Sequence, residues 1–311
     1  METWQLVLII VIPSLAVLGL IAYLVFYLYI SNMMANLMVY PKHFKTTLEK
    51  QESNAALGDI GDTSKYQRTP INFIMSDGYV IHGDYSLNNP KKFVICMHGH
   101  RGNREGLQKY SWAFFRLGYS VVFYDHRSHG DENVREKVTM SYQEHKDAVE
   151  VIKQVREKFG NDIELGLFGN SMGGATALTC TKEYQDLSFV VSDSGFAGVE
   201  YLVKAFIKMH KSPMFPILQF TEMFIKHKAG FRYKDASVKD VLKENKNVPV
   251  LFIQGEKDEL VYPENAKVLF DSDAGVKRLE WFKDADHCNA VVIDRERYYK
   301  VIEEFIKENV K

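Results

Sequence analysis

The sequence predicts an α/β protein in which helices cover both faces of a mostly parallel sheet, preceded by one long apolar helix. Three observations support this fold class. Short apolar runs alternate with amphipathic segments between residues 71 and 309, as expected for parallel strands joined by helical crossovers. A long uncharged stretch lies at the N-terminus. Reactive side chains follow several predicted strands directly, and ligands of parallel sheets gather at these carboxyl ends.

The composition is that of an ordinary globular protein. The 311 residues, of which 25% are charged and 46% apolar, suffice for one large domain with an insertion or for two small domains. A net charge of −1 gives no electrostatic basis for a nucleic-acid partner. Cys96, Cys180 and Cys288 are far apart and odd in number, which predicts neither a metal site nor a disulfide framework and suits a reducing compartment.

Residues 1–40 are predicted to form a single-pass transmembrane anchor. No charged residue occurs between Glu2 and Lys42, and Leu6 to Ile30 is predominantly apolar, whereas about 20 apolar residues suffice to span a bilayer. A secretory signal has a basic start and a shorter apolar core, so we favour an uncleaved anchor. A buried core helix is the alternative. Trp4 and the tyrosines of residues 23–29 are candidates for the membrane interface.

The residues after the apolar stretch indicate its orientation. Lys42, Lys45 and Lys50 follow it, whereas only the α-amino group precedes it. The positive-inside rule therefore predicts that the catalytic domain is cytoplasmic. Residues 41–67 are polar and contain Gly58 and Gly61, which predicts a linker. The domain would then comprise residues 68–311.

The elements of this domain can be assigned in order. Apolar runs at residues 71–75 and 79–82 flank Asp77-Gly78, which is a hairpin signal. Gly118 and Gly160 stand where helices would end. The remaining strands are predicted at residues 92–97, 120–124, 163–168, 187–191, 248–253 and 277–282, and the helices at 105–117, 142–159, 175–178, 263–270 and 295–308.

The alternation of strands and helices stops between residues 196 and 247. Residues 199–210 and 216–227 have a helical pattern rich in methionine and aromatic residues, with Pro213 and Pro216 between them. We expect a helical cap inserted into the domain. Such residues usually form core, but in a cap they equally line an apolar acyl site.

A Gly-x-Ser-x-Gly pattern, residues 169–173, lies between a predicted strand and a predicted helix. A serine there occupies a tight turn that exposes its hydroxyl above the sheet. The pattern alone is weak, because glycine and serine are common in loops. A serine nucleophile also needs a histidine base, and the histidine needs a carboxylate partner. Ser171, Asp258 and His287 occur in the order expected for such an elbow.

Each of these assignments has an alternative. Ser171 is otherwise a small turn residue, and His287 a histidine of a surface loop. Glu256 and Asp193, which also follow predicted strands, compete with Asp258 for the role of the acid.

Taken together, the motifs resemble the α/β-hydrolase superfamily, and within it the serine-aminopeptidase-like and bacterial esterase-like members with a small helical cap. The resemblance covers residues 70–309 and excludes the apolar N-terminus. The matching segments are His98-Gly99, Asp125–Gly130, Gly169–Gly174, Gly255–Asp258 with Val261 and Pro263, and Asp286-His287.

The resemblance implies an α/β-hydrolase fold and an oxyanion hole formed by the backbone N–H groups of Met172 and His100. His100 replaces the small or apolar residue that often follows His-Gly. Two histidines and a carboxylate within residues 125–130 raise the possibility of a metal site, but the resemblance favours a structural turn in which Arg127 pairs locally. His98 is then structural, and neither a metal nor an organic cofactor is expected.

The function that follows is a membrane-anchored serine hydrolase that cleaves ester, thioester or amide bonds. A carboxylesterase or lipase-like activity on a small-molecule or lipid-like acyl substrate is favoured. The serine argues against dehalogenases and epoxide hydrolases, which carry aspartate at the elbow. The alternatives are an aminopeptidase-like amide hydrolase, for which the sequence offers no clear acidic pair to bind an amine, and a catalytically silent binding module.

Overall fold

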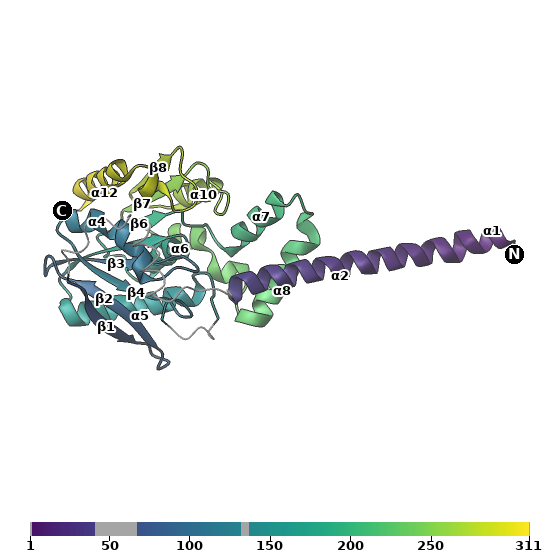
Figure 1. The fold of residues 1–311 in the computed structure, drawn as a ribbon, viewed down its shortest axis with the longest axis horizontal. Helices are drawn as coiled ribbons and strands as arrows, with labels where there is room; N and C mark the ends of the chain where they lie inside the picture. The colour runs from purple at the N-terminus through teal and green to yellow at the C-terminus, as the bar shows by residue number, and fades with distance from the viewer. Residues whose placement is uncertain (1, 41–66, 132–136, 311) are drawn as a thin grey trace.

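The computed structural model describes residues 2–40, 67–131 and 137–310. Their strands form an eight-stranded sheet in the order β1-β2-β4-β3-β5-β6-β7-β8 (Figure 1). The hairpin of β1 and β2 and the β2–β4 pair are antiparallel, and the other pairs are parallel. The predicted mostly parallel sheet is therefore confirmed. The strands are β1 Thr69–Ile74, β2 Val80–Ser86, β3 Lys92–Met97, β4 Ser120–Tyr124, β5 Glu164–Asn170, β6 Phe189–Asp193, β7 Val250–Gly255 and β8 Lys277–Phe282.

The central strands are apolar on both faces because both faces are covered. In β3, Phe93 and Ile95 belong to one hydrophobic cluster, whereas Val94 and Cys96 belong to the other. This alternation follows from the two-residue period of a strand. Helices α5 (Tyr142–Phe159), α6 (Met172–Thr179) and α10 (Glu264–Ser272) contribute to the first cluster, and α4 (Gln108–Arg116) and α12 (Arg295–Asn309) contribute to the second. The layered α/β architecture is the one that the sequence predicts.

Local signals account for the ends of the longest crossover helix, α5. The Glu144 carboxylate accepts hydrogen bonds from the backbone N–H groups of Thr139 and Ser141, each at 2.9 Å, and so satisfies donors at the start of the helix. Gly160 ends the helix with a φ of 118°, which a residue with a side chain rarely adopts.

Residues 196–247 form helices and no strand, and the structure describes all of them. We call them the cap segment. It contains α7 (Val199–Met209), α8 (Met214–Ala229), a 3₁₀ turn (Tyr233–Ala236) and α9 (Val238–Leu242). The two predicted helices agree with α7 and α8.

The N-terminus is a continuous helix from Thr3 to Val39, comprising α1 (Thr3–Leu6), a π-helical turn (Val7–Val11) and α2 (Ile12–Val39). It is long and apolar enough to cross a membrane, and it is the one such helix among the described residues. Most of it projects away from the sheet, with the N-terminus far from the domain (Figure 1).

The last turns of α2 differ from the rest, because they pack into the domain. Met34, Ala35 and Val39 are buried there. The Ser31 hydroxyl donates to the carbonyl of Ile217 in α8 at 3.2 Å. The end of the helix is thus part of the hydrophobic core. The predicted linker, residues 41–67, lies outside the described residues except for residue 67.

Candidate active site

Ser171 occupies the turn between β5 and α6, with φ 54° and ψ −117°. Such a backbone is strained for a residue with a side chain, and the surrounding glycines make it possible. A Cβ on Gly169 would lie 2.1 Å from the carbonyl oxygen of Gly173, and a Cβ on Gly173 would lie 2.1 Å from that of Met97. Only glycine permits this close approach of strand and helix, so the five-residue pattern is explained by packing.

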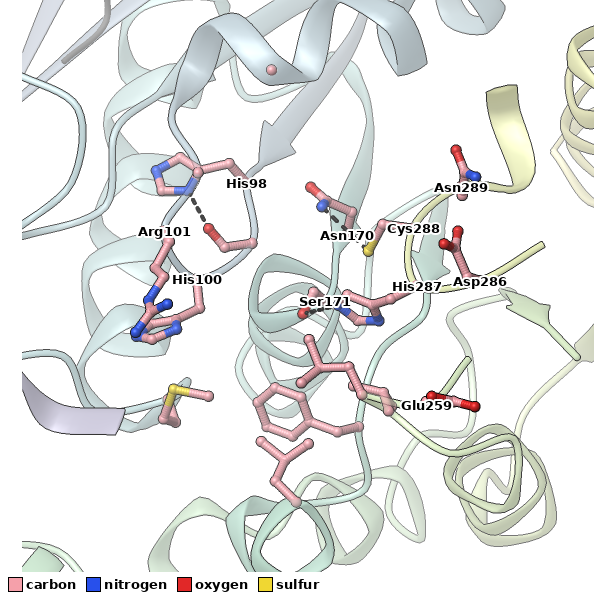
Figure 2. Close-up of a pocket in the computed structure, with 18 of the residues that line it drawn as sticks. His98, His100, Arg101, Asn170, Ser171, Glu259, Asp286, His287, Cys288 and Asn289 are labelled. Carbon is pink, nitrogen blue, oxygen red and sulfur yellow. Dashed lines mark hydrogen bonds between the residues drawn. The ribbon is translucent and has the colours of Figure 1, made fainter. Parts of the chain in front are cut away.

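His287 and Asp258 lie beside this serine, after β8 and β7 respectively. His287 Nε2 is 2.9 Å from Ser171 Oγ, and His287 Nδ1 is 2.8 Å from Asp258 Oδ2. Figure 2 shows the contact between the serine and the histidine in the pocket. Three residues far apart in the chain are therefore in one hydrogen-bonded row.

The Asp258 carboxylate is buried and held by several donors. Its Oδ1 accepts the backbone N–H groups of Leu260 and Val261 at 2.9 and 2.8 Å, and its Oδ2 accepts the Gln254 amide at 3.0 Å. These bonds fix the carboxylate in the orientation that faces the imidazole.

The two alternative acids are placed differently. Asp193 is buried at the end of β6, where its carboxylate accepts the hydroxyls of Ser194 and Tyr298, each at 2.9 Å. Burial raises the pKa of Asp193 despite these bonds. Glu256 is exposed to solvent. Of the three carboxylates, the hydrogen bond to His287 belongs to Asp258.

The electrostatic environment of His287 favours its protonated form. Burial alone would lower its pKa, but the neighbouring Cys288 sulfur and the Asp258 carboxylate together raise the pKa above its usual value. A histidine that accepts a proton during a reaction is stabilised by such a partner. The arrangement can therefore take a proton from Ser171 Oγ and hold it.

The loop after β3 lies against the serine. A Cβ on Gly99 would lie 3.0 Å from Ser171 Cβ, so the His98–His100 loop lies next to the hydroxyl. Burial and the positive charge of Arg101 lower the pKa of His100 to about 4, and its side chain is thus neutral near pH 7. Met172 is the first residue of α6, where backbone N–H groups lack partners within the helix.

The Asp125–Gly130 segment forms a buried network of ion pairs. Asp125 accepts the backbone N–H of Arg104 at 2.7 Å and also pairs with its guanidinium. Arg127 Nε lies 2.6 Å from Asp147 Oδ2, and its guanidinium also reaches Asp77. Arg127 therefore pairs with neighbouring carboxylates. Within residues 2–40, 67–131 and 137–310, no group of three or more His, Cys, Asp or Glu side chains could hold a metal ion.

A cavity of about 740 Å³ adjoins Ser171 and His287. One group of apolar lining residues comes from three separate regions of the chain. We call this group the apolar wall. It consists of Met34, Leu37 and Met38 of α2, Met140 before α5, and Phe196, Leu202, Phe206 and Met209 of the cap segment.

The contribution of α2 to the cavity was missed from the sequence. Residues 31–39 do carry a signal: Ser31, Asn32 and Asn36 interrupt the apolar run, while Met34, Leu37 and Met38 recur at helical spacing. This amphipathic pattern at the end of an otherwise uniformly apolar helix indicates a change of environment.

Comparison with known proteins agrees with this architecture. The family model of the serine aminopeptidases S33 matches residues 88–239, which include the elbow but end before Asp258 and His287. The Pyrococcus furiosus esterase Pf2001 superimposes with a TM-score of 0.64 at 21% identity, over 79% of this chain and 94% of that one. An Exiguobacterium antarcticum esterase gives a TM-score of 0.54 at 19% identity, over 76% and 98%. These structures show that the chain has the α/β-hydrolase fold, and together with the family match they support a hydrolase.

Three curated relatives match this chain at 28–30% identity. Bacillus subtilis protein YqkD is 28% identical over 74% of this chain and 76% of its own length. Protein bem46 of Schizosaccharomyces pombe is 29% identical over 46% of this chain and 43% of its own. The proline iminopeptidase of Thermoplasma volcanium is 30% identical over 41% and 45%. Of these three relatives, the proline iminopeptidase is the one whose name states an activity.

Proposed function

We propose that the protein is a serine hydrolase that cleaves carboxylic esters, with Ser171 as nucleophile, His287 as base and Asp258 as its acidic partner. The observation that carries the proposal is the row of contacts at 2.9 and 2.8 Å. A protein without catalytic activity does not require a strained serine, a histidine within hydrogen-bond distance of it and a buried carboxylate bonded to that histidine. The catalytically silent alternative is therefore disfavoured.

The mechanism is acyl transfer in two steps. His287 Nε2 takes the Ser171 proton while Oγ bonds to the substrate carbonyl carbon, and the carbonyl electron pair moves onto its oxygen. The backbone N–H groups of Met172 and His100 would stabilise this oxyanion; such a donor is typically worth about 10²–10³ in rate. The intermediate collapses as His287 returns the proton to the leaving group. Water, deprotonated by His287, then releases the acid and regenerates Ser171.

The apolar wall favours acyl esters over peptides. Leu202, Phe206 and Met34 line the cavity, and such side chains accommodate a hydrocarbon chain better than a peptide backbone, which needs hydrogen-bond partners.

We also propose that residues 1–40 anchor the protein in a membrane, followed by a linker at 41–67 and a hydrolase domain at 68–311 whose cap is the segment 196–247. A secretory signal sequence would also be apolar and N-terminal. The length of the helix and the burial of its last turns in the domain support a retained anchor. Lys42, Lys45 and Lys50 favour a cytoplasmic domain.

A fluorophosphonate probe, which reacts with activated serines, tests the enzyme proposal. We expect labelling of the wild-type chain and none of Ser171→Ala. Persistent labelling of this variant would show that another residue is the nucleophile. Folded wild-type protein that takes up no label would favour the silent module.

A second candidate is aminopeptidase-like hydrolysis, because two carboxylates, Glu259 and Asp286, line the cavity. They supply the negative charge that a free amino terminus needs, a pair that the sequence pattern alone had not revealed. Amino-acyl and fatty-acyl fluorogenic substrates compared on the same preparation distinguish the two activities. Preference for a free amino group, lost in Glu259→Gln, would favour the peptidase.

A further inference from the structure

The apolar stretch of the N-terminal helix ends where the helix enters the domain. Ile30 closes the apolar run of residues 6–30, and the first fully buried residue is Ser31, bonded to Ile217 of α8. At 1.5 Å per residue, this run is about 37 Å long, enough to cross a hydrocarbon core of about 30 Å. A bilayer that contains the run would therefore end close to the α2–α8 contact.

The connection between α7 and α8 lies close to this contact, because Ile217 is only two residues beyond Phe215. In the view of Figure 1 it extends from the domain in the direction of the N-terminus, along α2. We call residues 204–215 the tip. Its side chains Met209, Met214 and Phe215 are 45%, 43% and 70% exposed. Exposed apolar side chains that cluster beside an apolar helix are typical of a surface that enters a membrane interface.

The charge of the tip suits an anionic surface. Lys204, Lys208 and Lys211 lie within it, and residues 201–221 contain no aspartate or glutamate. Lys204 and Lys208 have glutamate partners outside the tip, at 2.5 and 3.8 Å, and the second contact is exposed and weak. A basic residue near an anionic leaflet contributes about 1 kcal/mol of attraction.

The apolar wall connects this level to the reacting serine. Met34 and Met38 line the cavity, and they follow Ile30 by four and eight residues. Along a helix this is about 6–12 Å. Met209 belongs both to the tip and to the cavity lining. Apolar residues thus extend from the end of the span to the cavity that contains Ser171.

We propose that the tip docks on an anionic bilayer surface and that the cavity receives a membrane-resident acyl ester directly from that bilayer. The proposal rests on the proposed anchor and serine hydrolase function, and it names their substrate class. The acyl chain would pass along Met209 and Met34 while the ester carbonyl reaches Ser171.

The test uses the full chain reconstituted in vesicles of phosphatidylcholine alone or of phosphatidylcholine and phosphatidylglycerol in equal amounts. A long-chain umbelliferyl ester dissolved in the bilayer is compared with water-soluble umbelliferyl acetate. Phe215→Asp removes the most exposed apolar side chain of the tip. Leu87→Asp is the matched control, because Leu87 is 58% exposed. It directly follows β2, whose last residue pairs with the start of β4, and it therefore lies at the opposite edge of the sheet from the carboxyl ends of the parallel strands.

We expect Phe215→Asp to lower turnover of the bilayer ester about tenfold, since partial burial of a phenylalanine is worth about 1.4 kcal/mol, without a comparable loss on the acetate. Leu87→Asp should change neither rate. Lys211→Glu should reduce the acceleration by phosphatidylglycerol and serves as a second variant should Phe215→Asp fail to fold.

The outcomes separate the two proposals. Equal rates of Phe215→Asp and Leu87→Asp on the bilayer ester, with normal acetate hydrolysis, would overturn the docking of the tip and leave the serine hydrolase standing. A wild-type chain inactive on both esters would overturn the proposed function itself, and the docking proposal with it.

Discussion

The two sides of the cavity are built on different principles. On the reactive side, Ser171, His287 and Asp258 each follow a strand of one sheet, and directional hydrogen bonds fix their positions. On the apolar wall, side chains come from α2 and the cap segment and are held by packing. Directional bonds define one geometry, whereas packing tolerates changes of shape. The reactive side should therefore determine whether reaction occurs, and the apolar wall which acyl chain reacts.

The largest expected effect follows from removal of the proposed base, His287. His287→Ala should reduce ester turnover by about 10⁶, the scale found when one member of such a set is lost. Its side chain is partly exposed, so the thermal midpoint should change little. Turnover and thermal unfolding measured on the same preparation test this. A mild loss of turnover would show that another group takes the proton.

A smaller but still large effect is expected at the acid. Asp258→Asn should lower kcat by about 10⁴, because the amide no longer favours the required imidazole tautomer. Asp193→Asn is the matched comparison, since Asp193 is equally buried but bonds to Ser194 and Tyr298. A larger loss of kcat in Asp193→Asn than in Asp258→Asn would show that Asp193 is the acid that supports His287.

The pH dependence of kcat/KM tests the proposed roles of His287 and Asp258 on the reactive side. His287 must be neutral to accept the proton, so kcat/KM should rise with pH as the imidazolium loses its proton. The Asp258 carboxylate contributes to raising the pKa of His287. Asp258→Asn removes that negative charge, so the rising limb should move to lower pH while the maximal rate falls. A limb that does not move in Asp258→Asn would mean that another group controls it.

The smallest effect is expected on the apolar wall. Leu37 lines the cavity and is 44% exposed, so Leu37→Ala should cost little stability. We expect about a tenfold lower kcat/KM for long acyl esters relative to short ones, the scale of a few lost methylene contacts. Met33→Ala is the control on the same helix, because Met33 is 37% exposed and is not among the cavity-lining residues. Equal chain-length profiles of the two variants would exclude α2 from substrate binding.

The sequence predicts the reactive side far better than the apolar wall. Strand ends in a parallel sheet converge on one edge, so the order of Ser171, Asp258 and His287 along the chain sufficed to anticipate a common site. Gly169 and Gly173 added a steric requirement that is visible in the sequence. The strands and main helices were likewise recoverable, with bounds that differ by up to about four residues, because period and turn residues determine the elements locally.

The apolar wall could not be predicted, because it depends on tertiary packing between remote segments. Nothing in the local pattern indicates that Met34 and Phe206 line the same cavity, since both are simply apolar residues of helices. The side chains of Glu259 and Asp286 were also not assigned to the cavity, because neighbouring positions on a loop can point in different directions.

Because the N-terminal helix is continuous, the length of its span and the rotation of its last turns respond differently to added residues. Residues 6–26 are apolar on nearly every side and precede Tyr27, which packs against the core, so this part of the helix has no preferred rotation in lipid. Adding or removing a residue there changes the bilayer thickness that it fits. One residue added after Ser31 would instead turn the rest of the helix by about 100° relative to the span and disturb the contact with Ile217. Changes in the length of the span are thus tolerated, whereas contacts with the domain fix the rotation of residues 31–39 about the helix axis.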